Sequence, residues 1–437
     1  LGTLTNFFTT VLKPRLLKNS FYTVLALAFI GLVPFVFNIF VARTFGKDIL
    51  GEINIALSFS LMVTLFVTNF FGSTANKFLA EYRGRKDLEA FQFVFLFSLI
   101  TPFVFLTCIN AIILWKWDFL SHQFSINATL LFPIIAYIYL RSFYIIIRRI
   151  FYGVDLVKYY AIIEIFADLV FFISLFIVSK LHLSYYLIHC YLSAYTIFTI
   201  IGFFHLFKKY THITHDLESE QSFHYKTILS KISHYGFLTM IGTSASTGTG
   251  YLSMIFTGYY LSSSDAGLYS SVLSIISILM FLPRLTSQVL LPEFSKLYGA
   301  GKSTSILQTL KIAFGLLLII AIAVNGILFI FAENILMLFG PTFSSGSLIL
   351  RIILPSVFLR MISVPLITFL SGTKYVLHPN IGGVIIFITS VACWFFLVPI
   401  YGLLGIALGY SIGIATGLIY LMIMGGFKLR AFHLEYE

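Results

Sequence analysis

The sequence predicts an all-α, polytopic membrane protein with about 12 transmembrane helices in two pseudo-symmetric six-helix lobes around a central cavity. Composition is the first reason. Of the 437 residues, 59% are apolar and only 10% are charged, whereas soluble domains are about 45–50% apolar and about 25% charged. Aromatic residues make up 18% of the chain, which excludes a disordered protein. The apolar residues also form runs long enough to cross a bilayer, which needs roughly 20 residues.

Twelve such runs follow one another, separated by polar or basic breaks. Because so many spans follow, we expect the first run to be the first helix rather than a cleaved signal. Twelve spans of roughly 20 residues use a little over half of the chain, in line with its apolar content. The approximate cores are 20–42, 53–75, 91–114, 128–147, 159–179, 185–207, 235–260, 268–291, 312–331, 346–370, 380–398 and 402–425.

The net charge of +11 is explained most simply by topology. With the N-terminus in the cytoplasm, about 20 Lys and Arg residues fall in inner segments and about four in outer ones. Cytoplasmic loops carry such an excess of positive charge. We therefore expect a multi-pass protein with both termini cytoplasmic and no nucleic-acid partner. The outer four are Arg43, Lys47, Lys116 and Lys180.

The two halves of the chain show an internal repeat. At an offset of 216 residues the matches include Gly51 with Gly267, Phe78 with Phe294 and Tyr82 with Tyr298, and at 219 they include Arg141 with Arg360. Six helices per repeat give both halves one orientation, related by an axis near the membrane normal. Such halves commonly enclose a cavity that rocking exposes to each side in turn. We predict an N-terminal lobe at 1–207, a cytoplasmic linker at 208–234 and a C-terminal lobe at 235–437.

Helix-breaking residues occur at matching places in the two repeats. Pro34 lies in the first span, and its counterpart at 242–250 reads GTSASTGTG, with Gly248 and Gly250 at its end. Proline bends a helix, and unwound backbone inside a membrane must face a cavity or protein. We expect Pro34, Gly248 and Gly250 to act in gating. Small residues also allow close helix packing, so the segment fits either role.

Four arginines lie within spans, each at a cost of roughly 2.5–3.5 kcal/mol at mid-depth. Arg351 is near the outer start of its span, where its side chain can snorkel to the surface. Arg141, Arg284 and Arg360 lie deeper. Guanidinium binds phosphate through two hydrogen bonds, so these three would suit an anionic head such as a pyrophosphate. The alternative is a structural ion pair with a membrane acid.

Two acids lie within the spans, and they share one helix face. Glu164 and Asp168 are spaced i and i+4. They could couple transport to a proton or a sodium ion, neutralise Arg141, or lie at a solvated helix end.

Asn38, Asn69 and Asn325 are mid-span amides, for which interhelical hydrogen bonding is the usual role. Asn38 and Asn69 are also candidates for substrate contact.

Signatures of enzymes, metals and cofactors are missing from the sequence. There is no GxxxxGK[ST] loop, no GxSxG and no DxD. The three cysteines form no CxxC, and His212, His215 and His224 in the predicted linker are too loosely spaced for a typical zinc site. We therefore expect a protein that is not an enzyme, with no cofactor and no bound metal.

Short inner-loop motifs carry a family resemblance. The segment 290–298 reads LLPEFSKLY and is followed by GAGK, and its counterpart at 75–82 reads ANKFLAEY. Together with the two six-helix halves, they resemble the polysaccharide (oligosaccharidyl-lipid) flippases of the multidrug/oligosaccharidyl-lipid/polysaccharide exporter superfamily. Asn38 stands where the drug-extruding branch of that superfamily commonly has an acid. The peptidoglycan-precursor branch usually has two further helices.

The resemblance implies a flippase that moves undecaprenyl-diphosphate-linked oligosaccharide across the bacterial cytoplasmic (inner) membrane by alternating access, for O-antigen, capsule or related polysaccharide. Membrane lipids would surround a monomeric transport unit, and a polysaccharide polymerase would be a partner. One alternative is an ion-coupled antiporter of small amphipathic drugs, which would favour acids over arginines in its cavity. Another is a membrane scaffold that transports nothing.

Overall fold

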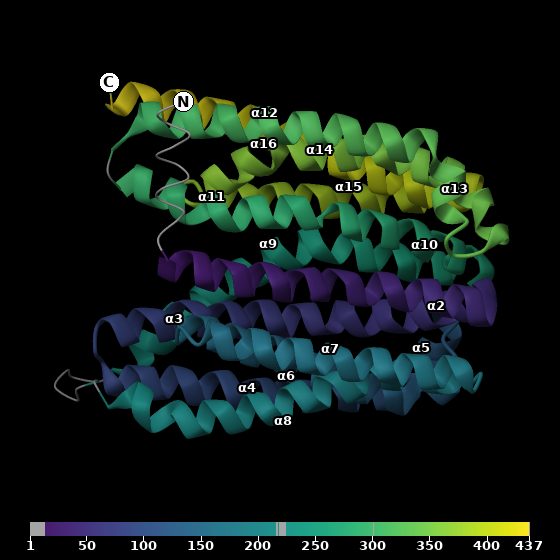
Figure 1. Ribbon diagram of the computed structural model, residues 1–437, viewed down its shortest axis with the longest axis horizontal. Helices are drawn as coiled ribbons and strands as arrows, with labels where there is room; N and C mark the ends of the chain where they lie inside the picture. Colours follow the sequence, from purple (N-terminus) through teal and green to yellow (C-terminus); the bar gives the residue numbers. More distant parts are fainter. Residues whose placement is uncertain (1–13, 216, 218–223, 300, 437) are drawn as a thin grey trace. The chain divides into compact units, whose positions relative to one another are not determined.

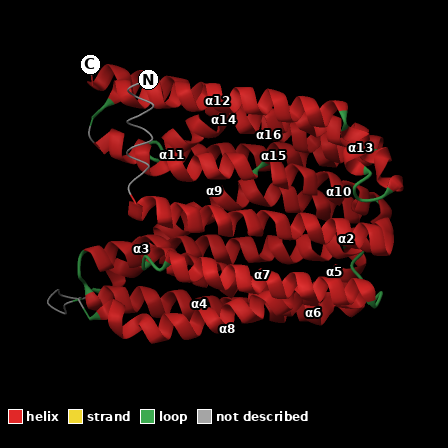
Figure 2. Cartoon of the chain, in the orientation of Figure 1, coloured by secondary structure: helices red, strands yellow, loops and turns green. Residues whose placement is uncertain are grey.

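A computed structural model describes the chain except for residues 1–13, 216, 218–223, 300 and 437. Within the described residues the secondary structure is helical, with short loops and no strand (Figure 2). This confirms the all-α prediction. The part of the predicted linker that contains Asp216, Glu218 and Glu220 lies outside the described residues.

The principal helices are α2 (Pro14–Val67), α3 (Ser73–Gly84), α4 (Leu88–Trp115), α5 (Trp117–Gln123), α6 (Leu131–Gly153), α7 (Val157–Lys180), α8 (Leu187–Thr214), α9 (Tyr225–Tyr260), α10 (Ser263–Leu279), α11 (Phe281–Gly299), α12 (Ser303–Ile330), α13 (Ala332–Leu336), α14 (Ser347–Ser371), α15 (Leu377–Tyr401) and α16 (Leu403–Tyr436) (Figure 1). Short 3₁₀ turns precede α6, α8 and α14, and a π-helix, Thr68–Gly72, joins α2 to α3.

Ten stretches among the described residues are long and apolar enough to cross a membrane. One of them, Gly31–Gly84, contains two of the predicted spans, and α9 is not among the ten. The small polar residues at 242–250 lower the hydropathy of α9. Counting both spans of the first stretch and adding α9 gives the twelve helices expected from the sequence.

The helix α2 folds back on itself at Gly46. This glycine has φ 84° and ψ −176°, outside the helical region. On either side of it, Asn54 Nδ2 donates a hydrogen bond to Asn38 Oδ1 at 2.9 Å. Sixteen residues of continuous helix would hold these side chains about 24 Å apart. The parts of α2 at 35–45 and 47–66 therefore lie side by side as a hairpin (Figure 1).

The described chain forms two compact units. Unit 1 comprises the described part of 1–34 with 67–112 and 132–237, and unit 2 comprises 35–66, 113–131 and 238–437. The boundary between the units crosses α2 after Pro34 and crosses α9 after Phe237. The predicted lobes, 1–207 and 235–437, stay a prediction based on the repeat.

Two kinds of packing hold the helices together. In unit 1, aromatic rings fill the space between α6 and α8, with the Tyr144 ring 4.7 Å from Phe198 and 4.8 Å from Tyr195. In unit 2, glycines every fourth residue along α16 let α15 approach its backbone. A Cβ at Gly413 would lie 1.9 Å from Ser390 Oγ, and one at Gly405 would lie 2.4 Å from the Leu397 carbonyl oxygen. Small residues at this spacing are a common solution for membrane helices.

We expect Gly46→Ala to destabilise the protein. The backbone at this position lies in a region that glycine alone occupies readily, so a side chain should cost about 1–3 kcal/mol. A Cβ there meets nothing within 4 Å, so the effect is conformational and not steric. Thermal unfolding in detergent, followed by size-exclusion chromatography, would measure it. Gly84→Ala is the matched control because it also has open space and its φ is not positive; equal melting temperatures for both variants would contradict the hairpin.

Candidate functional site

Both intramembrane acids lie in the interior of unit 1, on α7. Glu164 is 2% exposed and Asp168 is 8% exposed. The Tyr144 hydroxyl on α6 donates a hydrogen bond to Glu164 Oε1. Arg148, one turn further along α6, donates from Nη1 to the same hydroxyl at 3.4 Å. A tyrosine hydroxyl thus connects a cation to a carboxylate inside the helix bundle.

Aromatic rings enclose Arg141. Its Nη1 donates to the Tyr195 hydroxyl of α8 at 2.8 Å. Its guanidinium carbon lies 5.0 Å from the ring centroids of both Tyr144 and Tyr195. Cation–π contacts of this kind contribute about 0.5–2 kcal/mol each, more when water is excluded. Arg141 is therefore held between α6 and α8 by two tyrosines.

The two acids keep unused hydrogen-bonding capacity. Glu164 Oε2 and Asp168 Oδ2 are buried and accept no hydrogen bond within the described part of the chain. The structure records no direct ion pair between either carboxylate and an arginine among those residues. A buried polar atom without a partner costs about 1–3 kcal/mol. Burial does not fit the solvated helix end considered for these acids, whereas neutralisation of Arg141 and ion coupling stay predictions.

Arg360 and Arg284, both in unit 2, have different surroundings. Arg360 is half-buried in α14 between Pro355 and Pro365, and within the described residues it makes no hydrogen bond or ion pair. Arg284 is exposed in the first turn of α11, just after the break at Met280 that ends α10. Of the pair that the repeat aligned, Arg141 is enclosed by tyrosines, whereas Arg360 has no hydrogen-bond or ion-pair partner in the described part of the chain.

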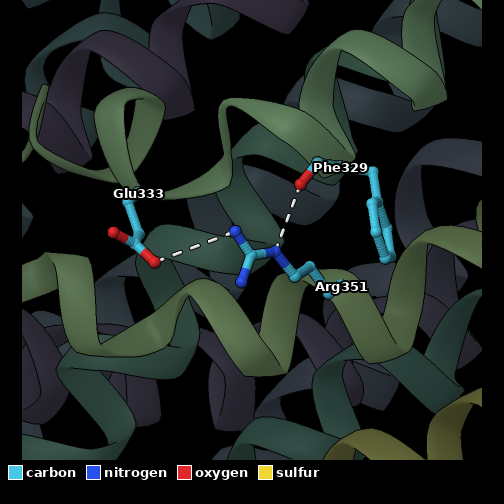
Figure 3. Close-up of polar contacts among 3 residues, drawn as sticks. All are labelled: Phe329, Glu333 and Arg351. Carbon is cyan, nitrogen blue, oxygen red and sulfur yellow. Dashed lines mark hydrogen bonds and ion pairs between the residues drawn. The ribbon is translucent and has the colours of Figure 1, made fainter.

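Arg351 caps the end of α12 (Figure 3). Its Nε donates to the Phe329 carbonyl oxygen at 3.1 Å, and Nη2 lies 3.8 Å from Glu333 Oε1. The side chains of Arg351 and Glu333 are 33% and 56% exposed, so the ion pair contributes at most about 1 kcal/mol. Arg351 has a local structural role at a helix end, in agreement with its expected place near the start of its span.

The candidate amides are buried and make contacts within the protein. Asn38 Nδ2 donates to Ser274 Oγ at 2.6 Å, in addition to accepting from Asn54. Asn325 donates to the Ala321 carbonyl oxygen at 2.8 Å. Asn69 lies in the π-helix Thr68–Gly72, a rare element that is frequent at functional sites. A role of Asn38 or Asn69 in substrate contact stays a prediction.

The expected unwinding at 242–250 does not occur. The backbone of α9 is helical from Tyr225 to Tyr260, and that of α2 is helical through Pro34. Serine and threonine hydroxyls satisfy the local carbonyls; for example, Thr249 Oγ1 donates to the Ala245 carbonyl oxygen at 2.9 Å. A Cβ at Gly248 would lie 3.0 Å from Met62 Sδ, whereas Gly250 has open space. Gating by Pro34, Gly248 or Gly250 would thus require bending within continuous helices.

Sequence reasoning missed Arg148 and the tyrosines of unit 1. The span core predicted at 128–147 ends before Arg148, although α6 continues to Gly153. The spacing of Arg141, Tyr144 and Arg148 at i, i+3 and i+7 places all three on one helix face, so periodicity could have identified them. Tyr195 contacts Arg141 because α8 packs against α6, and no pattern in the sequence predicts that contact.

These features define a polytopic helical membrane protein with ionisable groups enclosed between its spans, an arrangement typical of transporters. A family profile described as polysaccharide biosynthesis protein matches residues 16–298, and one described as MatE matches 239–395. Because the first match covers more than half of the chain, the protein belongs to the polysaccharide biosynthesis protein family. A comparison with curated proteins gave no match.

Solved structures with the same fold belong to the MOP superfamily. The inward-facing conformation of a multidrug resistance MATE family transporter has a TM-score of 0.76 at 17% identity, covering 92% of this chain and 95% of the other. The lipid II flippase MurJ in an inward closed conformation has a TM-score of 0.68 at 16% identity, covering 93% and 87%. A MOP superfamily transporter from Pyrococcus furiosus has a TM-score of 0.67 at 15% identity, covering 95% and 96%.

We expect Tyr144→Phe to weaken unit 1. The change removes the hydroxyl between Arg148 and Glu164 and leaves a buried carboxylate oxygen without its donor, at a cost of about 1–3 kcal/mol. The melting temperature in detergent would measure it. Tyr139→Phe is the matched control, because its hydroxyl donates to Thr107 Oγ1 in an exposed contact on the same helix. A melting temperature for Tyr144→Phe no lower than that of the control would show that the hydroxyl is not structural.

Proposed function

We propose that the protein is a flippase that moves undecaprenyl-diphosphate-linked oligosaccharide from the inner to the outer leaflet of a bacterial cytoplasmic membrane, for O-antigen, capsule or related polysaccharide. The observation that carries the proposal is Arg360, a half-buried guanidinium in the middle of a membrane helix with no partner in the described residues. An unpaired cation within a span is expensive and is retained for a function.

An anionic cargo explains this arginine better than a cationic one. A diphosphate offers several oxygens to a guanidinium and can be held by two parallel hydrogen bonds. Arg360 and the exposed Arg284 would receive the diphosphate, and Arg141 would be a further candidate for the same role. Asn38 and Asn69 would contact the sugar or phosphate. The lipid tail would stay in the bilayer.

The comparisons support this class of cargo in two ways. The family to which the chain belongs is described by polysaccharide biosynthesis, and MurJ, which has the same fold, is described as a lipid II flippase. For the Pyrococcus furiosus transporter, reverse polarity of the binding pocket is said to suggest a different function. The sign of the charges that line the transport cavity is therefore a reasonable criterion for distinguishing an anionic from a cationic cargo among proteins with this fold.

The proposal also includes a membrane topology and a transport unit. The excess of Lys and Arg in alternate loops puts both termini in the cytoplasm. The lobes at 1–207 and 235–437 would rock about the linker at 208–234 and expose the cavity to each side in turn. A monomer would be the transport unit, membrane lipids its surroundings, and a polysaccharide polymerase its partner.

The buried carboxylates favour a second candidate, an ion-coupled antiporter of small amphipathic drugs. Glu164 and Asp168 would bind a proton or sodium ion through their free oxygens. The same two residues also fit a flippase driven by an ion gradient. Arg360, which has no partner among the described residues, separates the candidates, since a cavity for cationic drugs would be expected to exclude a guanidinium.

Arg284→Ala and Arg360→Ala should each abolish surface glycan while the protein remains in the membrane at normal level, because the diphosphate loses its charge partner. Glycan display in a strain lacking the chromosomal copy would measure export, and immunoblotting of membranes would measure level. Arg351→Ala is the control, since that guanidinium caps α12. Normal surface glycan in both Arg284→Ala and Arg360→Ala would contradict the proposal that these arginines bind the cargo. It is also the result expected of a membrane scaffold that transports nothing.

Glu164→Gln and Asp168→Asn should remove the dependence of transport on an ion gradient. The amides keep the size of the side chain and lose the charge that a proton or cation would neutralise. Uptake into proteoliposomes, with proton and sodium gradients imposed in turn, would measure it. Gln92→Asn, a change of a neutral side chain on α4, serves as the control. Unchanged gradient dependence in both acid variants would exclude them as coupling residues.

A further inference from the structure

The inner ends of α7 and α8 carry a group of basic and aromatic side chains that the proposed transport does not use. The ring centroids of Tyr159 on α7 and His205 on α8 lie 5.2 Å apart. Lys209, one turn after His205, has its Nζ 5.8 Å from the centroid of the Tyr159 ring. Lys158 and Lys208, the sequence neighbours of Tyr159 and Lys209, are exposed. Three lysines, here called the inner lysines, thus lie at the end of one helix pair.

The inner lysines have no ion-pair partner in the part of the chain that the structure describes. None of the three makes a hydrogen bond there, and the one contact of this group is that of Lys209 with the Tyr159 ring. His205 Nδ1 is buried and also lacks a hydrogen-bond partner among those residues. Like charges repel more strongly near lipid, where the dielectric constant is lower than in water. A bound anion would offset this repulsion.

Two contacts fix how α7 and α8 are aligned. Toward the outer end, the hydroxyl oxygens of Ser174 and Ser193 are 3.2 Å apart. Toward the inner end, the Tyr159 ring lies beside the His205 ring. The helices are therefore antiparallel neighbours within unit 1, and residues whose numbers add up to about 366 lie at the same level along the pair.

From the inner lysines toward the membrane centre, the exposed faces of both helices become apolar. Residues four apart lie on the same face of a helix, so each helix presents a lysine followed by large apolar side chains. The alignment places these exposed residues in level pairs: Lys158 with Lys208, Ile162 with Phe204, and Phe166 with Ile200. A surface with cations at one end and apolar side chains beyond them is complementary to an anionic lipid.

An anionic phospholipid fits this surface better than a zwitterionic one. A phosphate with net negative charge satisfies the lysines, whereas the ammonium group of a zwitterionic lipid would be repelled by them. The polyprenyl diphosphate of the proposed cargo is anionic as well. It is a biosynthetic intermediate, however, and an exposed apolar face is occupied by the lipids that are present in excess, by mass action.

We propose that the inner end of the α7–α8 pair binds one anionic phospholipid of the cytoplasmic leaflet. The inner lysines hold its phosphate, and its acyl chains lie against Ile162 and Phe204. Tyr159 positions Lys209 through the cation–π contact, and His205 donates to the phosphate from Nε2. The inference rests on the topology that places these helix ends in the cytoplasm and does not depend on the identity of the cargo.

Native mass spectrometry of the full chain in detergent tests the proposal. The protein would be titrated with phosphatidylglycerol and, separately, with phosphatidylethanolamine of the same acyl chains. A lysine near a membrane surface contributes about fivefold to the binding of an anionic headgroup. We expect Lys209→Ala to weaken phosphatidylglycerol binding by about that factor, whereas Lys209→Arg, which keeps the charge, retains it. Replacing all three inner lysines with alanine should abolish the preference for phosphatidylglycerol.

Lys116→Ala is the matched control for Lys209→Ala. Lys116 also lies over an aromatic ring, with its Nζ 4.1 Å from the Trp115 centroid, but in an outer segment of the predicted topology. The control for the triple variant replaces Lys47, Lys116 and Lys180 with alanine and removes the same charge. Equal weakening by inner and outer variants, or equal affinity of the unmodified protein for the two lipids, overturns the proposal. Size-exclusion chromatography would check that each variant is folded.

Competition identifies the lipid that occupies the site. Undecaprenyl diphosphate would be added to protein loaded with phosphatidylglycerol. We expect it to displace the phospholipid no more effectively than further phosphatidylglycerol does. Displacement at about tenfold lower concentration, lost in the triple inner variant, would assign the site to the cargo lipid and overturn the phospholipid assignment. None of these measurements reads glycan export, so a failure of the proposed function would leave their outcome unchanged.

Discussion

One constraint governs this structure: a polar group inside a membrane helix must find its partner within the protein, because lipid offers none. Serine and threonine meet it locally, as when Ser60 Oγ donates to the Ala56 carbonyl oxygen at 2.9 Å. The charged groups of unit 1 meet it by sharing a tyrosine hydroxyl, since Tyr144 stands between Arg148 and Glu164. The aromatic packing of α6 against α8 follows from the same need, because the rings that fill the interior also carry the hydroxyls.

The buried polar groups that lack a hydrogen-bond partner among the described residues are the candidates for a functional role. Arg360 has no partner in the described residues, and the free oxygens of Glu164 and Asp168 have no donor. We propose that the arginine binds an anionic cargo and that the acids bind a proton or a small cation. Arg351, by contrast, makes a hydrogen bond to the end of α12 and lies beside Glu333, so its contacts are local.

Glycine residues allow neighbouring helices to approach each other closely in this fold. Along α16 it lets α15 pack against the backbone, and at Gly51 and Gly267 it brings the two repeats into direct contact. The α15–α16 contact extends over several turns, whereas the contact of Gly51 with Gly267 is one close approach near the tip of the α2 hairpin.

The sequence by itself determined the class of fold, because composition and the length of apolar runs report directly on the solvent around each segment. It also determined the twelve spans and the equivalence of Gly51 with Gly267, since a repeat is a property of the chain. It could not show that α9 stays helical through 242–250, that α2 turns at Gly46, or that Arg141 is enclosed by tyrosines while Arg360 is not. Those outcomes depend on which side chains of other helices come near, and only the tertiary structure decides which buried polar groups are satisfied.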